Sequence, residues 1–269
     1  MRFLIGGILA VIVAAAAYRT RALSESGAIA AFVVGLVVFG FGGWAFALPL
    51  LTFFVSSTLL SRWRRRSKEA LGYEKGGRRD SGQVLANGGI AALCALVYGL
   101  PHYWGLGGEL LPHSVASHAY VLYLAALAAA NADTWATEVG SAIGGRVRSI
   151  VSGKIVPIGI SGGVSVAGTL ALVAGSLAIA AFNILFHPAS TSTSPLYAPL
   201  LGGIAGALVD SVLGATLQAQ WRDPQRPERL TERKPEASTP PVKGLAWVGN
   251  DCVNLVCTAT AVAVAWLLR

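Results

Sequence analysis

HAYVLYLAALAAANADTWATE, residues 118–138, is long and apolar enough to cross a bilayer as one helix. It contains no Lys or Arg, yet it carries Asp133 and, at its end, Glu138. An ionised carboxylate within a bilayer costs about 2.5–3.5 kcal/mol on insertion scales, so such a group usually binds or moves something. The stretch therefore predicts a membrane-spanning helix that carries part of a functional site.

Similar apolar stretches recur along the whole chain, which is 54% hydrophobic and 13% charged, with a mean hydropathy of +0.60. Each approaches the length of about 20 residues that a helix needs to cross the hydrocarbon core. We therefore expect an all-α fold, a polytopic membrane helix bundle of about 8 transmembrane helices, as a single integral-membrane domain over residues 1–269. The expected spans are 3–18, 27–42, 44–61, 82–100, 118–138, 162–186, 197–217 and 244–268. The second and third could instead form one bent element.

The distribution of basic residues supports eight spans, because Lys and Arg stay on the cytoplasmic side. With this count, only Arg2 and Arg269 of the 21 basic residues fall on the opposite side. The net charge of +8 is therefore explained mainly by the placement of basic residues in cytoplasmic connections. We expect a bacterial inner-membrane protein with both termini outside and a site that faces the cytoplasm. Arg19 and Arg21 directly follow the first span and favour its retention over cleavage as a signal peptide.

Two further acids, Asp210 and Asp251, lie within apolar stretches that contain no Lys or Arg. With the expected spans, both lie about 10 Å below the cytoplasmic edge, close to the level of Asp133 and Glu138. A structural alternative pairs each acid with a Ser, Asn or Trp donor. Convergence at one depth favours an external cation instead. We expect Asp133, Asp210 and Asp251 to bind metal and, with Glu138, to form the catalytic set.

Polar residues repeat along the faces of these helices. Arg79, Gln83 and Asn87 follow at four-residue spacing, and Asn254 lies on the face of Asp251. Asp133 and Glu138 are rotated by about 140° on an ideal helix. Either the helix breaks between them or only one reaches the shared site.

Two connections have the composition of phosphate-binding loops. In the segment 62–80, Gly76-Gly77 precede Arg78-Arg79, and the segment 158–165 brings glycines and hydroxyls to a predicted helix start. Backbone N–H groups at such a start favour anions. The chain has no P-loop and no kinase catalytic-loop motif, so a nucleotide needs another arrangement. The expected nucleotide-binding set is Arg78, Arg79, Gln83, Asn87, Lys154, Ser161, Gly162, Gly163, Ser165 and Asn254.

Several motifs resemble the integral-membrane family that contains plant and cyanobacterial phytyl-phosphate kinase. They are distributed along most of the chain: SESGAIAAFVVG (24–35), RRDSGQVLANGG (78–89), NADTWATEVG (131–140), SGGVSVAGTL (161–170), LVDSVLGATLQ (208–218) and GNDCVNL (249–255). The resemblance implies transfer of a nucleotide γ-phosphate, from CTP, to an isoprenoid (phytyl or prenyl) monophosphate. Mg²⁺ would be the metal, the lipid phosphate, the nucleotide and the bilayer would be the partners, and no nucleic acid is expected.

Other functions stay open at this point. An ion-coupled membrane transporter would use the acids for protons or Na⁺, but it needs groups near the midplane and access from both faces. A CTP-dependent lipid cytidylyltransferase would use the same metal and release pyrophosphate. A scaffold without chemistry leaves the intramembrane acids unexplained.

Overall fold

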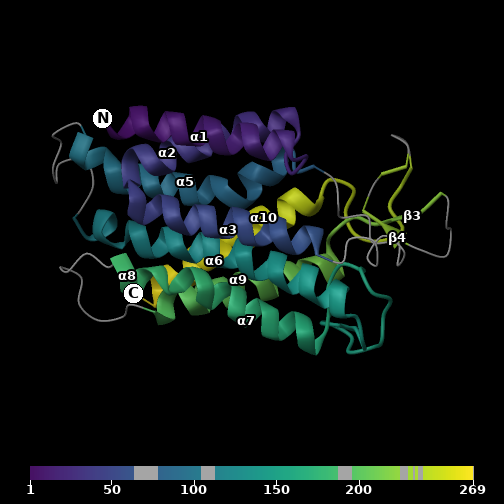
Figure 1. Ribbon diagram of the computed structural model, residues 1–269. Helices are drawn as coiled ribbons and strands as arrows, with labels where there is room; N and C mark the ends of the chain where they lie inside the picture. Colours follow the sequence, from purple (N-terminus) through teal and green to yellow (C-terminus); the bar gives the residue numbers. More distant parts are fainter. Residues whose placement is uncertain are drawn as a thin grey trace.

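The computed structural model describes residues 1–63, 78–103, 113–186, 196–224, 230–232, 234–235 and 239–268. Figure 1 shows long helices side by side, with both chain ends at the same end of the bundle and strands β3 and β4 beyond the other. The expected Gly76-Gly77 turn lies outside the described residues. The helices are α1 (Arg2–Arg19), α2 (Glu25–Gly42), α3 (Trp44–Arg62), α5 (Ser81–Tyr103), α6 (His113–Ile143), α7 (Val166–Ala180), α8 (Phe182–Phe186), α9 (Tyr197–Thr216) and α10 (Asn250–Leu267).

Seven helices among the described residues are long and apolar enough to cross a membrane. They are α1, α2, α3, α5, α9, α10 and the stretch Val166–Phe186, which joins α7 to the short α8. The remaining long helix, α6, has 31 residues and corresponds to the expected span 118–138. The polytopic helical bundle predicted from the sequence is thus confirmed.

The second and third spans are separate helices. Gly43 lies between α2 and α3 with φ of 65°, a conformation that L side chains rarely adopt, so the chain turns there. The alternative of one bent element is excluded.

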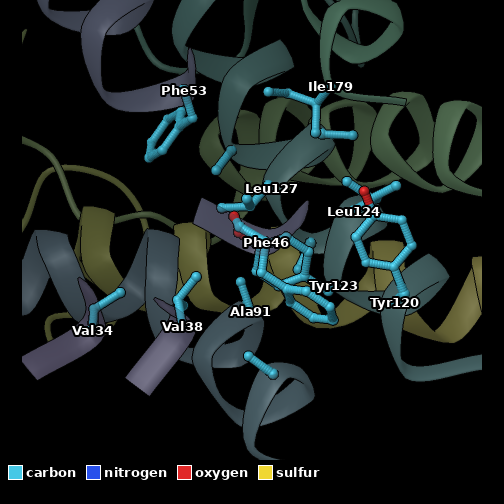
Figure 2. Packing of buried hydrophobic residues seen from close by; sticks show 14 residues of the cluster. Val34, Val38, Phe46, Phe53, Ala91, Tyr120, Tyr123, Leu124, Leu127 and Ile179 are labelled. Atoms are coloured by element: carbon cyan, nitrogen blue, oxygen red, sulfur yellow. The ribbon is translucent and has the colours of Figure 1, made fainter. Parts of the chain in front are cut away.

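Helix α6 is the core of the bundle, since its residues Leu124–Ala130 are at most 1% exposed. Figure 2 shows aromatic and branched side chains packed around it. Phe46 of α3 contacts the rings of Tyr120 and Tyr123, and the Tyr123 hydroxyl donates to the Phe46 carbonyl. Such a bond satisfies a buried polar group that would otherwise cost several kcal/mol in lipid, or about 2–7 kcal/mol in general.

Small residues let α6, α9 and α10 approach closely, as is common in membrane bundles. A Cβ on Gly203 would lie 2.7 Å from the Cβ of Ala128, and one on Gly206 would lie 2.5 Å from the Cys257 carbonyl oxygen. Because neither contact tolerates a side chain, these glycines fix the register of the three helices.

Two small hairpins lie among the connections. Strand β1 (Arg148–Ser149) pairs antiparallel with β2 (Gly163–Val164), and β3 (Trp221–Arg222) pairs antiparallel with β4 (Leu230–Thr231). Isolated bridges also join Leu23 to Arg79 and Gln218 to Leu245. The first bridge joins the connections that precede α2 and α5, and the second joins the connection after α9 to the one before α10.

Four predicted helix boundaries are wrong. Helix α7 begins at Val166 rather than 162, and α10 begins at Asn250 rather than 244. Helix α6 runs from His113 to Ile143 rather than from 118 to 138. Residues before α10 cannot join the helix, because Gly244 has φ of 78° and its neighbours pair with the end of α9. Asp251 is therefore the second residue of its helix and not a residue two turns inside it.

Candidate functional site

A polar pocket lies between α6, the start of α7, the end of α9 and the turn that precedes β2. Asp133 of α6 and Asp210 of α9 both line it. Its other polar side chains come from the same elements: Thr137, Ser141, Ser161, Ser165, Thr169, Ser211 and Gln218. The pocket thus unites two of the four predicted acids with part of the predicted phosphate loop.

The helix register explains why Asp133 and Asp210 meet. The contacts of Gly203 with Ala128 and of Gly206 with Ala129 show that α6 and α9 run in the same direction at this point. One turn further along, Asp133 and Asp210 reach the same level. The two acids thus share a depth, as predicted. Asp210 lies six residues before the end of α9, close to its expected position, whereas Asp133 lies ten residues before the end of α6 because that helix continues to Ile143.

The Gly162 turn closes the polar pocket against α9. Gly162 has φ of 77°, and a Cβ there would lie 2.4 Å from the Cβ of Ala215. Only glycine allows the turn to reach this position. Gly163 belongs to strand β2 and also lines the pocket, so the segment is a turn with a short strand and not the first turn of a helix.

The hydroxyl groups of this segment already have partners. Ser165 caps α7 by accepting a hydrogen bond from Gly168 N–H at 3.1 Å. The Ser161 hydroxyl donates to the Glu232 carboxylate. Ser161 and Ser165 therefore shape the turn, and a ligand phosphate would meet backbone groups more readily than free hydroxyls.

Gln218 and Lys243 belong to the same region but were not among the predicted site residues, although Gln218 follows Asp210 at twice the four-residue spacing of a helix face. Gln218 is 2% exposed, and its Nε2 has no hydrogen-bond partner within the described residues. Lys243 directs Nζ toward the carbonyl of Gly214 at 3.4 Å, and burial lowers the pKa of this lysine. A Cβ on Gly214 would lie 3.1 Å from Gly162 N. An unsatisfied amide and a nearby cation suit a pocket that takes a polar ligand.

Arg79 and Glu138 form a second polar group on another side of α6. Arg79 donates from Nη1 to Ser57 Oγ at 3.2 Å, and Ser61 Oγ donates to Glu138 Oε1 at 2.7 Å. Burial lowers the pKa of Arg79, and the nearby Glu138 carboxylate opposes that shift. Since α6 is continuous through 133–138, the predicted rotation separates Glu138 from the polar pocket. Asn131 and Trp135 bond to Ser56, which is a structural role.

Asp251 lies beside Asp80, a residue the sequence analysis did not select. A Cβ on Gly82 would lie 2.3 Å from Asp251 Oδ2 and 3.4 Å from Asp80 Oδ1. Asp80 also accepts a hydrogen bond from Gln83 N at 3.0 Å, so it caps α5. Asp251 does not line the polar pocket, and the described residues contain no group of three or more metal-binding side chains. The expected three-aspartate metal set is therefore not assembled as one cluster.

The remaining predicted residues lie on α5, on α10 and in exposed connections. Asn254 is 8% exposed on α10, while Gln83 and Asn87 lie on α5, where Asn87 Nδ2 donates to the Gln83 carbonyl at 2.9 Å. Arg78 is exposed, with its guanidinium 6.0 Å from the centre of the Tyr18 ring. Lys154 is exposed in the hairpin turn. Neither Arg78 nor Lys154 lines the polar pocket, and their predicted role in nucleotide binding stays a prediction.

The bundle and its polar pocket define a polytopic integral membrane protein with a candidate site for charged ligands near the helix ends. The chain belongs to the family described as integral membrane protein DUF92, whose model matches residues 8–262. The family resemblance drawn from the motifs is thereby confirmed.

Three relatives illustrate the breadth of the family. The chain is 29% identical over 270 residues to Protein PGR of Arabidopsis thaliana, covering 95% of this chain and 92% of the relative. It is 30% identical over 200 residues to the uncharacterized membrane protein MJ0933 of Methanocaldococcus jannaschii, covering 74% and 76%. It is also 26% identical over 250 residues to Protein VTE6, chloroplastic, of Arabidopsis thaliana, covering 92% and 65%. No solved structure matches the chain.

Proposed function

We propose that this protein is a membrane-embedded kinase that transfers the γ-phosphate of CTP to an isoprenoid monophosphate and forms the prenyl diphosphate. The observation that carries the proposal is the convergence of Asp133 and Asp210, from two helices, on one pocket beside a glycine turn. The acceptor class is supported by the motifs that resemble the family containing phytyl-phosphate kinase, and the chain's membership of the DUF92 family agrees with that resemblance. The Arabidopsis relative Protein VTE6 belongs to the same set of similar proteins.

The residues present fit a magnesium–nucleotide complex. Mg²⁺ is usually held by one or two carboxylates together with substrate phosphates, so Asp133 and Asp210 suffice without a third acid. Bound there, the metal would neutralise charge on the donor phosphates. The backbone of the Gly162 turn would lie against the phosphates, Gln218 Nε2 would donate to an oxygen, and Lys243 would add positive charge at the rim.

The reaction balances without a general base. An oxygen of the acceptor monophosphate is ionised at neutral pH and attacks the γ-phosphorus of CTP. The new P–O bond forms as the bond from the γ-phosphorus to the β–γ bridging oxygen breaks, and CDP leaves with that electron pair. Positioning and charge stabilisation are the protein's contribution in such transfers. Arg79 is a partly buried cation on the α3 side of α6, and we assign the acceptor phosphate to it.

We further propose that the site faces the cytoplasm of a bacterial inner membrane. Arg62 at the end of α3 and Arg146 just after α6 lie at the helix ends nearest the polar pocket, and connections rich in basic residues stay cytoplasmic. A soluble nucleotide would then reach the pocket directly from the aqueous side.

The test is a product analysis with purified protein, Mg²⁺, CTP and a series of prenyl monophosphates. CDP together with a prenyl diphosphate supports the proposal. Pyrophosphate together with a CDP-linked lipid would instead identify a cytidylyltransferase. The absence of both products, with proton or Na⁺ transport in sealed vesicles, would identify a transporter.

A further inference from the structure

An apolar groove lies on the other side of α6 from the polar pocket, between α1 and α3, with α2 and α5 also lining it. Its lining is almost entirely aliphatic or aromatic except at one end. The apolar lining residues include Ala31, Phe39, Trp44, Ala47 and Phe54. Of the residues that line the apolar groove, only Arg79 has a role in the proposed phosphate transfer.

The apolar groove is long and follows the helices. Trp44 and Phe54 of α3 are ten residues apart and both line it, which corresponds to about 15 Å along the helix axis. Phe39 and Trp44 stand at its far end, where their rings meet edge to face at 4.9 Å between centroids. The far end is thus bounded by two large rings, and small residues, Ala47 close to this end and Ala31 further along, leave room between it and the polar end.

Polar groups are confined to the near end of the apolar groove. Arg79, Gln83 and Asn87 line it there together with Thr134 of α6. The backbone of Arg79 is bridged to Leu23, and its guanidinium is held by the hydrogen bond that Nη1 donates to Ser57 Oγ at 3.2 Å. A long apolar space with one cation at its entrance is complementary to a molecule that has one anionic head and one apolar tail.

We propose that the apolar groove binds the isoprenoid tail of the acceptor, with its phosphate at Arg79. The inference rests on the proposed kinase function and adds the position and the length limit of the acceptor. A single groove accommodates one narrow chain, which distinguishes a prenyl phosphate from a phospholipid with two acyl chains. The rings of Phe39 and Trp44 set the longest tail that fits.

The two pockets meet α6 at neighbouring residues, Thr134 in the apolar groove and Asp133 in the polar pocket. An acceptor phosphate at Arg79 and a donor in the polar pocket would therefore approach the same turn of α6 from two sides. This arrangement explains why the tail site and the aspartates occupy different pockets.

Photolabelling locates the tail directly. The full-length protein in detergent is irradiated with geranylgeranyl phosphate that carries a diazirine at the end of its tail, and labelled peptides are identified by mass spectrometry. We expect labels on the residues around Phe39, Trp44 and Ala47, reduced by unlabelled geranylgeranyl phosphate but not by inorganic phosphate or phosphatidic acid. Labels confined to the outer face of the bundle, or equal competition by phosphatidic acid, would overturn the proposal.

Chain-length selection tests the proposed limit. Ala47→Phe fills the far part of the apolar groove, whereas Ala15→Phe adds the same ring to the exposed face of α1, outside the groove. We expect Ala47→Phe to lower kcat/KM for geranylgeranyl phosphate at least about tenfold relative to dimethylallyl phosphate, a change of about 1.4 kcal/mol. Ala15→Phe should leave that ratio unchanged.

The outcomes separate this inference from the proposed function. If the protein turns over both acceptors, and neither Ala47→Phe nor the milder Ala47→Leu changes the ratio of their kcat/KM values, the groove is not the tail site but the kinase function stands. Specific labelling of the groove in a wild-type protein that transfers no phosphate would refute the kinase and support the groove as a prenyl-phosphate site. Should Ala47→Phe fail to fold, the labelling and the Ala47→Leu variant still decide.

Discussion

Asp210→Asn is the sharpest test of the polar pocket, because it removes one negative charge and keeps the size of the side chain. Asp210 and Asp133 are the two acids that line the pocket, so the variant halves the charge available to Mg²⁺ there. Loss of one preorganised electrostatic contact typically lowers kcat by about 10²–10³-fold, or about 2.7–4 kcal/mol. We expect a fall of at least that size.

Stability should change in the opposite direction. A carboxylate in an apolar bundle carries a desolvation cost that an amide largely avoids, so Asp210→Asn should melt at the same temperature or higher. The assay therefore records turnover with CTP, Mg²⁺ and prenyl phosphate beside thermal unfolding in the same detergent. Glu25→Gln, which neutralises an exposed acid in the first turn of α2, is the matched control and should alter neither.

The metal dependence identifies the cause of the lost activity. Removal of a ligand should raise the Mg²⁺ concentration that gives half-maximal turnover, and Asp133→Asn combined with Asp210→Asn should cost less than the product of the two single effects. Near-normal turnover in Asp210→Asn, or a loss that follows a lower melting temperature, would refute the assignment of this aspartate to the metal.

Three further predictions concern other parts of the chain. Arg79→Lys keeps a charge but loses the bidentate guanidinium, so it should raise KM for the prenyl phosphate about tenfold or more, whereas Arg78→Lys should leave KM unchanged in the same assay. Gly162→Ala forces a side chain against α9 at a positive φ and should destabilise the protein by at least about 1–3 kcal/mol. Gly249→Ala is the control for thermal unfolding, because a Cβ there meets nothing within 4 Å and should cost no stability. A topology reporter fused at residue 230 should be cytoplasmic and one at the C-terminus external, and a cytoplasmic C-terminus would contradict the eight-span arrangement.

The spans were predictable because hydrophobic length alone determines them. Helices α2, α3, α5 and α9 lie within three residues of their expected bounds. The start of α10 was missed because the preceding residues are apolar but are held outside the helix by Gly244 and by pairing with Gln218 and Gln220. Hydrophobicity does not report such contacts, which depend on a distant part of the chain.

The candidate site was predictable in part for the same reason. Helical periodicity placed Asp133 and Glu138 on different faces, and in the structure Asp133 lines the polar pocket whereas Glu138 lies outside it and accepts a hydrogen bond from Ser61. Asp80 and Lys243 were missed, since their neighbours come from tertiary packing rather than spacing. Asp80 follows a basic stretch and resembles a simple helix cap, and only the contact with Gly82 and Asp251 brings it to attention.

The separation of the two pockets by α6 follows from the physical difference between the two proposed substrates. A nucleotide carries several charges and needs a polar pocket that opens at the aqueous ends of the helices, where carboxylates, backbone N–H groups and Lys243 are found. A prenyl phosphate reaches the protein through the bilayer and needs an apolar path that ends at one cation. Because Asp133 and Thr134 are adjacent on α6, the helix can bring the reacting phosphates together while each substrate stays in the environment that dissolves it. A transporter would need no such division, since its ion would pass through one continuous polar path.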